Sequence, residues 1–167
     1  DRKKQGGKAE PVRIWCAASS TGQEPYTMAM LIHDYARLNR SQGLRTDDFA
    51  ILATDISTKC LDQARRGEYS ELEMSRGLPD YYRRHFRQED GRWRVDEDIK
   101  AMVDFQRVNL TERFSDIGEF QFISSRNVLI YFSDEARKSI MDQFYAMLPQ
   151  GGYLLLGASE GLYRWAR

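Results

Sequence analysis

Residues 12–25 read VRIWCAASSTGQEP, and they hold the first signals of an α/β fold. Residues 12–18 are largely apolar and rich in strand-forming types, which predicts a short buried strand. The polar run 19–24 predicts a loop, and Pro25 suits the first turn of a helix, where a missing backbone N–H costs no hydrogen bond. A helix over 26–38 should follow, and its many apolar residues predict that it is well buried.

The same order of elements continues along the chain. Further strands are predicted over 49–54, 120–124 and 153–156, and further helices over 57–66 and 133–148. Ser57 and Ser133 are suited to cap the two helices, and Gly67 is suited to end the first of them. Because the strands are continuously apolar and alternate with helices, we expect an α/β fold with a doubly wound, mostly parallel sheet covered on both faces.

The region 69–107 breaks this alternation. It is rich in charged and aromatic residues, and its Asp90-Gly91 dipeptide is typical of a two-residue hairpin turn. Strands are predicted over 92–95 and 102–108, so we expect a small, mostly antiparallel β insertion. The domain organisation expected is a flexible leader over 1–11, a main domain made of 12–68 and 108–167, and an inserted subdomain over 69–107.

Composition excludes several functional classes. The 167 residues include 25 Lys and Arg and 25 Asp and Glu, a formal net charge of +0, which argues against a dedicated nucleic-acid binder. No apolar run approaches the roughly 18 residues that span a bilayer, which argues against direct membrane insertion. The two cysteines and two histidines lack metal-ligand spacing, so we expect no metal site and a reducing, cytoplasmic compartment.

Polar residues follow three of the predicted strands, at the sheet edge where open α/β folds bind ligands. Asp55 ends the second strand, where an acid can accept both hydroxyls of a ribose; the alternative is that it only caps a helix in solvent. The preceding loop has one glycine, Gly22, and an acid, Glu24, whereas a dinucleotide site needs several glycines beside its phosphates. A cofactor with an ammonium group and no phosphate fits better, and S-adenosylmethionine has both features.

Three segments can be compared with known signatures, namely 17–26 (AASSTGQEPY), 125–132 (SRNVLIYF) and 151–160 (GGYLLLGASE). They resemble the signatures CSTGEEPYS, CRNVLIYF and GGYLFLGHSE of the CheR family, the chemotaxis receptor glutamate methyltransferases. The resemblance covers about residues 12–160. It implies a Rossmann-like class I methyltransferase that transfers a methyl group from S-adenosylmethionine to glutamate side chains of chemoreceptors. The products would be a methyl ester and S-adenosylhomocysteine.

The resemblance also implies site residues. The cofactor contacts would be Ala18, Glu24, Asp55, Asn109, Leu110, Arg126 and Asn127. In this set Glu24 meets the methionine ammonium, Asp55 holds the ribose, and Asn109 and Leu110 lie against the adenine. Arg126 and Tyr131 would be the catalytic residues, close to the sulfonium or to the incoming carboxylate. No general base is needed, because a glutamate with a free pKa near 4.3 is already ionised at pH 7.

The sequence departs from the family pattern in three places. The family's N-terminal helical domain has no counterpart here and is expected to be absent. Gln121 stands where the family usually has Asp, and Ser125 where it usually has Cys. Neither change removes a group that the mechanism requires. Two alternatives stay open: a module that binds a receptor or a regulator and catalyses weakly, and a methyltransferase with another acceptor.

The implied partner is the cytoplasmic domain of a methyl-accepting chemoreceptor. A receptor tail or a regulatory protein is also expected at the insertion 69–107, where an open strand edge would accept an extended peptide. The basic residues of this segment include Arg83, Arg84, Arg87, Arg92 and Arg94. These arginines either pair with an acidic tail or only protect the edge from aggregation.

Overall fold

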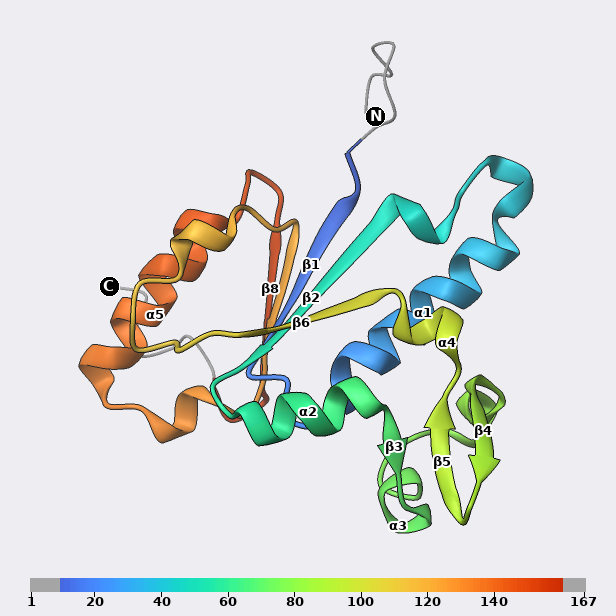
Figure 1. Cartoon of the computed structure of the whole chain (residues 1–167). Helices are drawn as coiled ribbons and strands as arrows, with labels where there is room; N and C mark the ends of the chain where they lie inside the picture. Colours follow the sequence, from blue (N-terminus) through green and yellow to red (C-terminus); the bar gives the residue numbers. More distant parts are fainter. Residues whose placement is uncertain (1–9, 161–167) are drawn as a thin grey trace.

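The structure, a computed structural model, describes residues 10–160 of the chain. Within that range the main sheet has five parallel strands, namely β1 (Val12–Ala17), β2 (Phe49–Asp55), β6 (Val103–Arg107), β7 (Phe122–Ser125) and β8 (Tyr153–Leu156). Their order across the sheet is β6-β2-β1-β7-β8 (Figure 1). Along the chain this is the order 3-2-1-4-5 of doubly wound nucleotide-binding folds, with the switch point between β1 and β7. The predicted fold class is confirmed, whereas most of the predicted leader and residues 161–167 lie outside the described residues.

Two core clusters form on the two faces of this sheet. On one face lie α1 (Gln23–Leu38) and α2 (Thr58–Arg66), which pack against Ile14 and Cys16 of β1. On the other lies α5 (Asp134–Met147), which packs against Trp15. The Trp15 ring is fully buried within 5.3–5.5 Å of three phenylalanine ring centroids, and its Nε1 donates to Thr54 Oγ1 at 3.0 Å. The buried tryptophan therefore has a partner for its one polar atom, as burial requires.

The helix ends follow the sequence signals. Ser57 Oγ accepts from the Cys60 backbone N–H at 3.3 Å, and Gly67 ends α2 with a φ of 64°. Ser133 caps α5 in the same way. The expectation for the first helix is wrong in one respect: α1 exposes a stripe made of Leu31, Tyr35 and Leu38. Only one flank of α1 packs on the sheet, and a run of apolar residues cannot indicate which flank that is.

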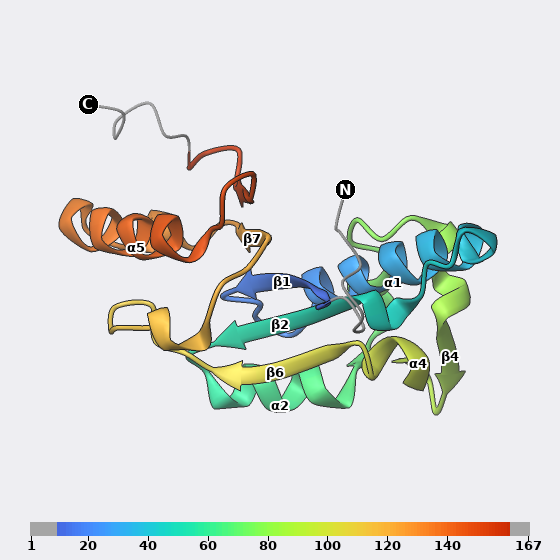
Figure 2. The ribbon, with the colours of Figure 1, turned by 90° about the horizontal axis from the view of Figure 1, so that it is seen from above.

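The inserted subdomain contains a three-stranded antiparallel sheet of β3 (Glu68–Tyr69), β5 (Arg92–Val95) and β4 (Phe86–Glu89), in the order β3-β5-β4. Asp90 and Gly91, with φ values of 50° and 74°, form the predicted turn between β4 and β5. Short helices flank the sheet: α3 (Glu71–Met74), η3 (Asp80–His85) and α4 (Glu97–Lys100). Figures 1 and 2 place β4 and α5 at opposite flanks of the molecule.

The predicted insertion is wrong at its C-terminal end. Residues 103–107 pair in parallel with β2, from Ile51 opposite Val103 to Asp55 opposite Arg107, and so form the edge of the main sheet. Val103 and Phe105 face the core, while the residues between and after them are exposed. An edge strand of a parallel sheet with this alternation has the same pattern as a half-exposed antiparallel strand. The antiparallel unit therefore ends before β6 and does not extend to residue 107.

A buried polar cluster ties the subdomain to α1. The Asp34 carboxylate on α1 accepts a hydrogen bond from Arg84 Nη2 and lies 3.2 Å from His85 Nε2 on η3. Asp34 and His85 are only 7% and 6% exposed. The ligand atoms of His33, Asp34 and His85 lie within 4.8 Å of one another, but the Arg84 guanidinium already neutralises the one carboxylate there.

The remaining helical turns are η1 (Arg40–Gln42), η2 (Thr46–Asp48), η4 (Ser115–Ile117) and η5 (Leu129–Tyr131). Among residues 10–160, none of the helices has the length and apolar character needed to cross a bilayer.

Candidate functional site

The loops that follow the main strands meet at one end of the sheet, the lower end in Figure 1. The Ser19 backbone N–H donates to the Thr54 carbonyl at 2.7 Å, which joins the loops after β1 and β2. The Val108 N–H donates to the Asp55 carbonyl at 3.2 Å, which brings the segment after β6 beside them. This is the edge of an open α/β sheet at which ligands bind.

The loop between β1 and α1 has an unusual backbone. Ala18, Ser20 and Gly22 have φ values of 55°, 51° and 94°, all in the left-handed region that only glycine adopts freely. A Cβ on Gly22 would lie 3.0 Å from Ala64 Cβ and 3.1 Å from Tyr69 Oη, so the position has no room for a side chain. Strained non-glycine residues of this kind cluster at ligand sites, where the surrounding structure holds them in place.

Asp55 holds two of these loops together. Its Oδ2 accepts from the Ser20 N–H at 2.9 Å, and its Oδ1 accepts from the Ser57 N–H at 2.9 Å. It is therefore not the cap of α2, which is Ser57; it joins the residue that precedes this helix to the loop after β1. A carboxylate has about four lone-pair sites, so each oxygen keeps one for a ligand hydroxyl.

An ion pair spans the switch point. Arg126 Nη1 lies 3.3 Å from Glu24 Oε2, with side-chain exposures of 49% for the arginine and 27% for the glutamate. Glu24 comes from the first turn of α1, where the helix dipole favours an acid, and Arg126 comes from the end of β7. Two of the sequence-predicted site residues are thus brought into contact, although they are far apart in the chain.

Buried hydroxyls near the switch point lack partners. Ser19 Oγ, Ser124 Oγ and Ser125 Oγ are all buried and make no hydrogen bond within the described part of the chain. A buried polar atom without a partner costs about 1–3 kcal/mol, so such atoms point to a bound water or ligand. With the acid Glu24 at the loop and one glycine there, this donor and acceptor set suits a phosphate-free, cationic nucleoside such as S-adenosylmethionine.

Asn109 and Leu110 follow β6, in the segment beside Asp55. The polar atoms of Asn109 already form hydrogen bonds, and the Leu110 side chain is buried. Asn109 Oδ1 accepts from Thr111 N at 3.1 Å, and its Nδ2 donates to Glu112 Oε1 at 2.9 Å. Leu110 is 6% exposed and packs in the core cluster of Trp15. The two residues expected at the adenine therefore lie at the same end of the sheet as Asp55. The Asn109 side chain already bonds the turn that follows it.

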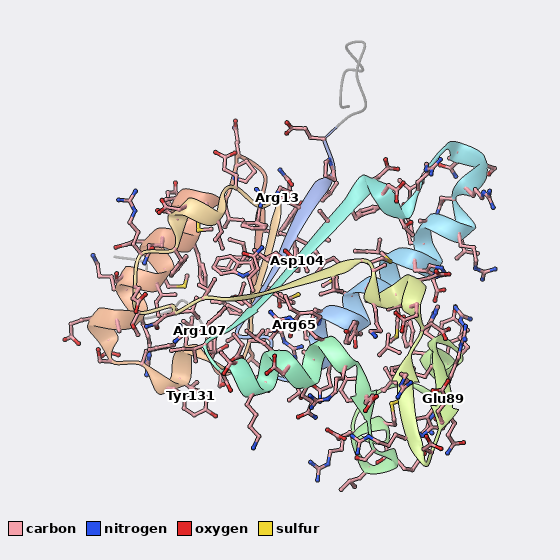
Figure 3. The ribbon with its side chains drawn as sticks, in the orientation of Figure 1. Arg13, Arg65, Glu89, Asp104, Arg107 and Tyr131 are labelled. Carbon is pink, nitrogen blue, oxygen red and sulfur yellow. The ribbon has the colours of Figure 1, made fainter. Side chains whose placement is uncertain are left out.

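Tyr131 lies apart from the ion pair. It ends η5, is 80% exposed, and points away from the molecule in Figure 3. Within residues 10–160 no hydrogen bond joins it to Arg126 or to Glu24. Asn127, next to Arg126, is also exposed and has a left-handed backbone with a φ of 58°.

Sequence reasoning assigned no role to Glu160, which the structure places at the centre of the loops after β7 and β8. This residue is 9% exposed, and its carboxylate accepts backbone hydrogen bonds from Asn127, Val128, Leu129 and Gly157. Its signal in the sequence was weak: an acid a few residues after an apolar strand, without a basic residue beside it among 150–160.

The family described as "CheR methyltransferase, SAM binding domain" matches residues 1–166. The chain is 47% identical over 154 residues to chemotaxis protein methyltransferase 1 of Vibrio cholerae, covering 91% of this chain and 55% of that protein. It is 43% identical over 165 residues to chemotaxis protein methyltransferase 1 of Pseudomonas aeruginosa, covering 96% and 58%. The chain thus spans little more than half the length of these curated relatives.

Solved structures agree on the fold. The DszA carbon methyltransferase matches 93% of this chain and 30% of its own, with a TM-score of 0.56 and 17% identity. The glycopeptide N-methyltransferase MtfA complexed with S-adenosyl-L-methionine matches 90% and 48%, with a TM-score of 0.53 and 12% identity. At such identities the likeness establishes the class I methyltransferase fold and says nothing about the acceptor.

Proposed function

This chain belongs to the CheR methyltransferase family through its SAM-binding domain, and from that membership we propose that it methylates glutamate carboxylates of a chemoreceptor. The methyl donor is S-adenosylmethionine, and the reaction takes place in the cytoplasm as part of chemotactic adaptation. The observation that carries the proposal is the ion pair between Glu24 and Arg126, which joins the first turn of α1 to the residue after β7 at the switch point.

The chain's own residues suit each part of the cofactor. Glu24 offers a carboxylate to the methionine ammonium, and Asp55 offers its remaining lone pairs to the ribose hydroxyls. The unpaired hydroxyls of Ser19 and Ser125 offer polar contacts at the same strand ends. Ala18 and Asn127 line the site through their backbone, and the end of β6 borders the adenine through Asn109 and Leu110. The two carboxylates of this set would repel a phosphate.

When bound, S-adenosylmethionine would supply an electrophilic methyl group, whose bond to sulfur would break as the acceptor oxygen bonds to it, with S-adenosylhomocysteine as the leaving group. An acceptor carboxylate that is already ionised has no proton to lose first. The protein therefore has to orient two groups and needs no general base. Arg126 is half exposed, so its free N–H groups can direct the incoming carboxylate. Glu24 partly neutralises the charge of Arg126 through their ion pair, so Arg126 binds the substrate carboxylate less tightly. A looser hold matters, because an arginine that bound the ground state tightly would slow the reaction.

Tyr131 is proposed to act on the acceptor side of the site. Its 80% exposure at the rim suits contact with a protein substrate near the incoming carboxylate. A hydroxyl there can donate to a carboxylate oxygen and help Arg126 to direct it.

A receptor tail or a regulatory protein is proposed to dock on the inserted subdomain. The free edge of β4 supports this, because its residues after Phe86 are exposed and β5 pairs with it on one side only. Charge gives less support, since five arginines of the subdomain already have acidic partners. The pairs are Arg83–Glu71, Arg84–Asp34, Arg87–Asp96, Arg92–Glu68 and Arg94–Glu68. Docking would then depend on backbone hydrogen bonds of an added strand.

The test is methyl uptake from radiolabelled S-adenosylmethionine into receptor-containing membranes, scored for base-labile release, which marks a carboxyl ester. Wild-type protein should transfer base-labile label, and the Arg126→Ala variant should transfer much less. Arg45→Ala is the matched control, because Arg45 is an exposed arginine before β2, away from the strand ends that form the site. Label that enters the membranes but resists base would overturn glutamate as the acceptor, and calorimetry with S-adenosylhomocysteine checks the cofactor separately.

A further inference from the structure

Glu160 binds the backbone of two loops at once. Its Oε1 accepts from the N–H groups of Val128 at 2.8 Å and Leu129 at 2.7 Å. Its Oε2 accepts from the N–H groups of Asn127 and Gly157, both at 2.8 Å. The carboxylate is thus held by backbone donors alone among the described residues, and three of these donors are consecutive.

Consecutive N–H groups can converge on one acceptor where the backbone alternates in hand. Asn127 is left-handed, with a φ of 58°, and Val128 follows with a φ of −122° and a ψ of −37°. This combination forms the concave anion-binding arrangement known from phosphate sites. Here a side chain of the protein itself fills the concavity, so the loop after β7 keeps this shape without a bound anion.

Gly157 leaves the space that the carboxylate needs. A Cβ at this position would lie 2.6 Å from Glu160 Oε2 and 3.0 Å from the Asn127 nitrogen. Its φ is not in the left-handed region, so the requirement for glycine comes from this contact and not from its backbone conformation. The glycine and the glutamate therefore act as one unit.

The strands do not need this unit. β7 and β8 pair through their own backbone from Phe122 opposite Tyr153 to Ser125 opposite Leu156. The bonds of Glu160 begin beyond that point, with Asn127 and Gly157. They fix the part of the chain that leaves the sheet, directly after Arg126.

We propose that Glu160 is a positioning residue for Arg126. It fixes the three peptide groups that follow Arg126, and so sets where the guanidinium meets Glu24 across the switch point. The role rests on the proposed function, in which the pair of Arg126 and Glu24 forms the methyl-transfer site. Glu160 itself touches neither of these side chains and acts only through the backbone.

The test uses Glu160→Gln in the full chain, because glutamine keeps the size but turns one acceptor oxygen into an NH₂ donor that faces N–H groups. Hydrogen exchange measured by NMR should show that the amides of 127–129 and 157 exchange at least about tenfold faster than in the wild type, while β7 and β8 stay protected. Glu119→Gln is the matched control, an exposed glutamate before β7. Faster exchange throughout both strands, or no change at the four amides, would overturn a local positioning role.

A double-mutant cycle gives the functional readout. Glu160→Gln and Arg126→Ala should each lower kcat/KM for receptor methylation by about tenfold, and the double variant should be about as active as the less active single variant. Effects that multiply would overturn the coupling. Gly157→Ala repeats the test with Glu160 intact, in case the glutamine variant does not fold. The hydrogen-exchange measurement needs neither cofactor nor receptor. If the wild-type protein failed to methylate receptors, the proposed function would be overturned, but the exchange result would still test the role of Glu160.

Discussion

Tyr69 of the inserted sheet donates its hydroxyl proton to the Thr21 carbonyl, in the loop after β1, at 2.8 Å. The tyrosine is 3% exposed, and burial foremost raises the pKa of its hydroxyl, so the group remains a donor at any physiological pH. The same hydroxyl closes the space beside Gly22. The subdomain that is proposed to dock a partner is therefore bonded directly to the loop that is proposed to hold the cofactor.

Tyr69→Phe removes the hydroxyl that makes this bond and closes the space beside Gly22, and it keeps the buried ring. A neutral hydrogen bond contributes about 0.5–1.5 kcal/mol, so we expect S-adenosylhomocysteine affinity to fall about 2- to 12-fold. Calorimetry measures the change, and Tyr145→Phe serves as the control because Tyr145 is 82% exposed on α5. Equal affinities for the wild-type and Tyr69→Phe proteins would show that the subdomain does not set the shape of the loop.

Asp55→Asn tests the ribose contact. The amide keeps the size of the side chain but loses its charge, and a charge-assisted hydrogen bond contributes about 1.5–3 kcal/mol. S-adenosylhomocysteine affinity should fall about 10- to 150-fold by calorimetry. Asp98→Asn, at an exposed position on α4, should leave it unchanged. Unchanged affinity in Asp55→Asn would leave this residue with only the two backbone bonds that it makes in the structure.

Arg126→Ala separates two ways in which the arginine can act. If it only directs the carboxylate, its loss should raise the KM for the receptor and leave kcat near the wild-type value. If it acts in the transition state, kcat should fall together with kcat/KM. Glu24→Gln frees Arg126 from its acidic partner, so we expect a lower receptor KM and a weaker affinity for the cofactor. A Glu24→Gln variant with unchanged values for both would remove the ion pair from the site.

The sequence allowed the main sheet to be predicted because its signals are local. Buried strands are apolar throughout, and Ser57, Gly67 and Ser133 define helix ends through bonds to their own neighbours. The edge strand β6 was misassigned because its alternation depends only on which side faces water. Which sheet such a strand joins is decided by its long-range pairing with β2, and that pairing leaves no local trace.

The candidate site was predictable in its residue types and less so in its contacts. The position of Asp55 after a buried strand was enough to place it at the right edge. The four bonds of Glu160 were not predictable, because a carboxylate that binds only backbone N–H groups has no partner type to search for in a sequence. The ion pairs of the insertion's arginines were not predictable either, because some of the acidic partners come from other elements, such as Asp34 on α1, which lies 50 residues before Arg84 in the chain.

Asp34 provides the last prediction, which concerns stability and pH. Burial of the Asp34 carboxyl raises its pKa, but hydrogen bonds from His85 and Arg84 outweigh burial, and the pKa lies below the ordinary value of 3.8. A lowered folded-state pKa means that the carboxylate stabilises the fold above about pH 3.8 and loses this effect as the pH falls through its folded value. Charged and titratable neighbours on both packed elements are His33, Arg84 and His85.

Asp34→Asn should therefore lower the free energy of unfolding by about 1–3 kcal/mol at pH 5, because Arg84 and His85 lose a charged acceptor and the amide offers only one oxygen in its place. The difference from wild type should shrink between pH 4 and pH 2, as measured by urea denaturation at each pH. Asp142→Asn is the control, since Asp142 forms an exposed pair with Lys138 that contributes little. A difference for Asp34→Asn that stays constant or grows as the pH falls would contradict a lowered pKa. It would then follow that packing, and not the charge of Asp34, joins the subdomain to α1.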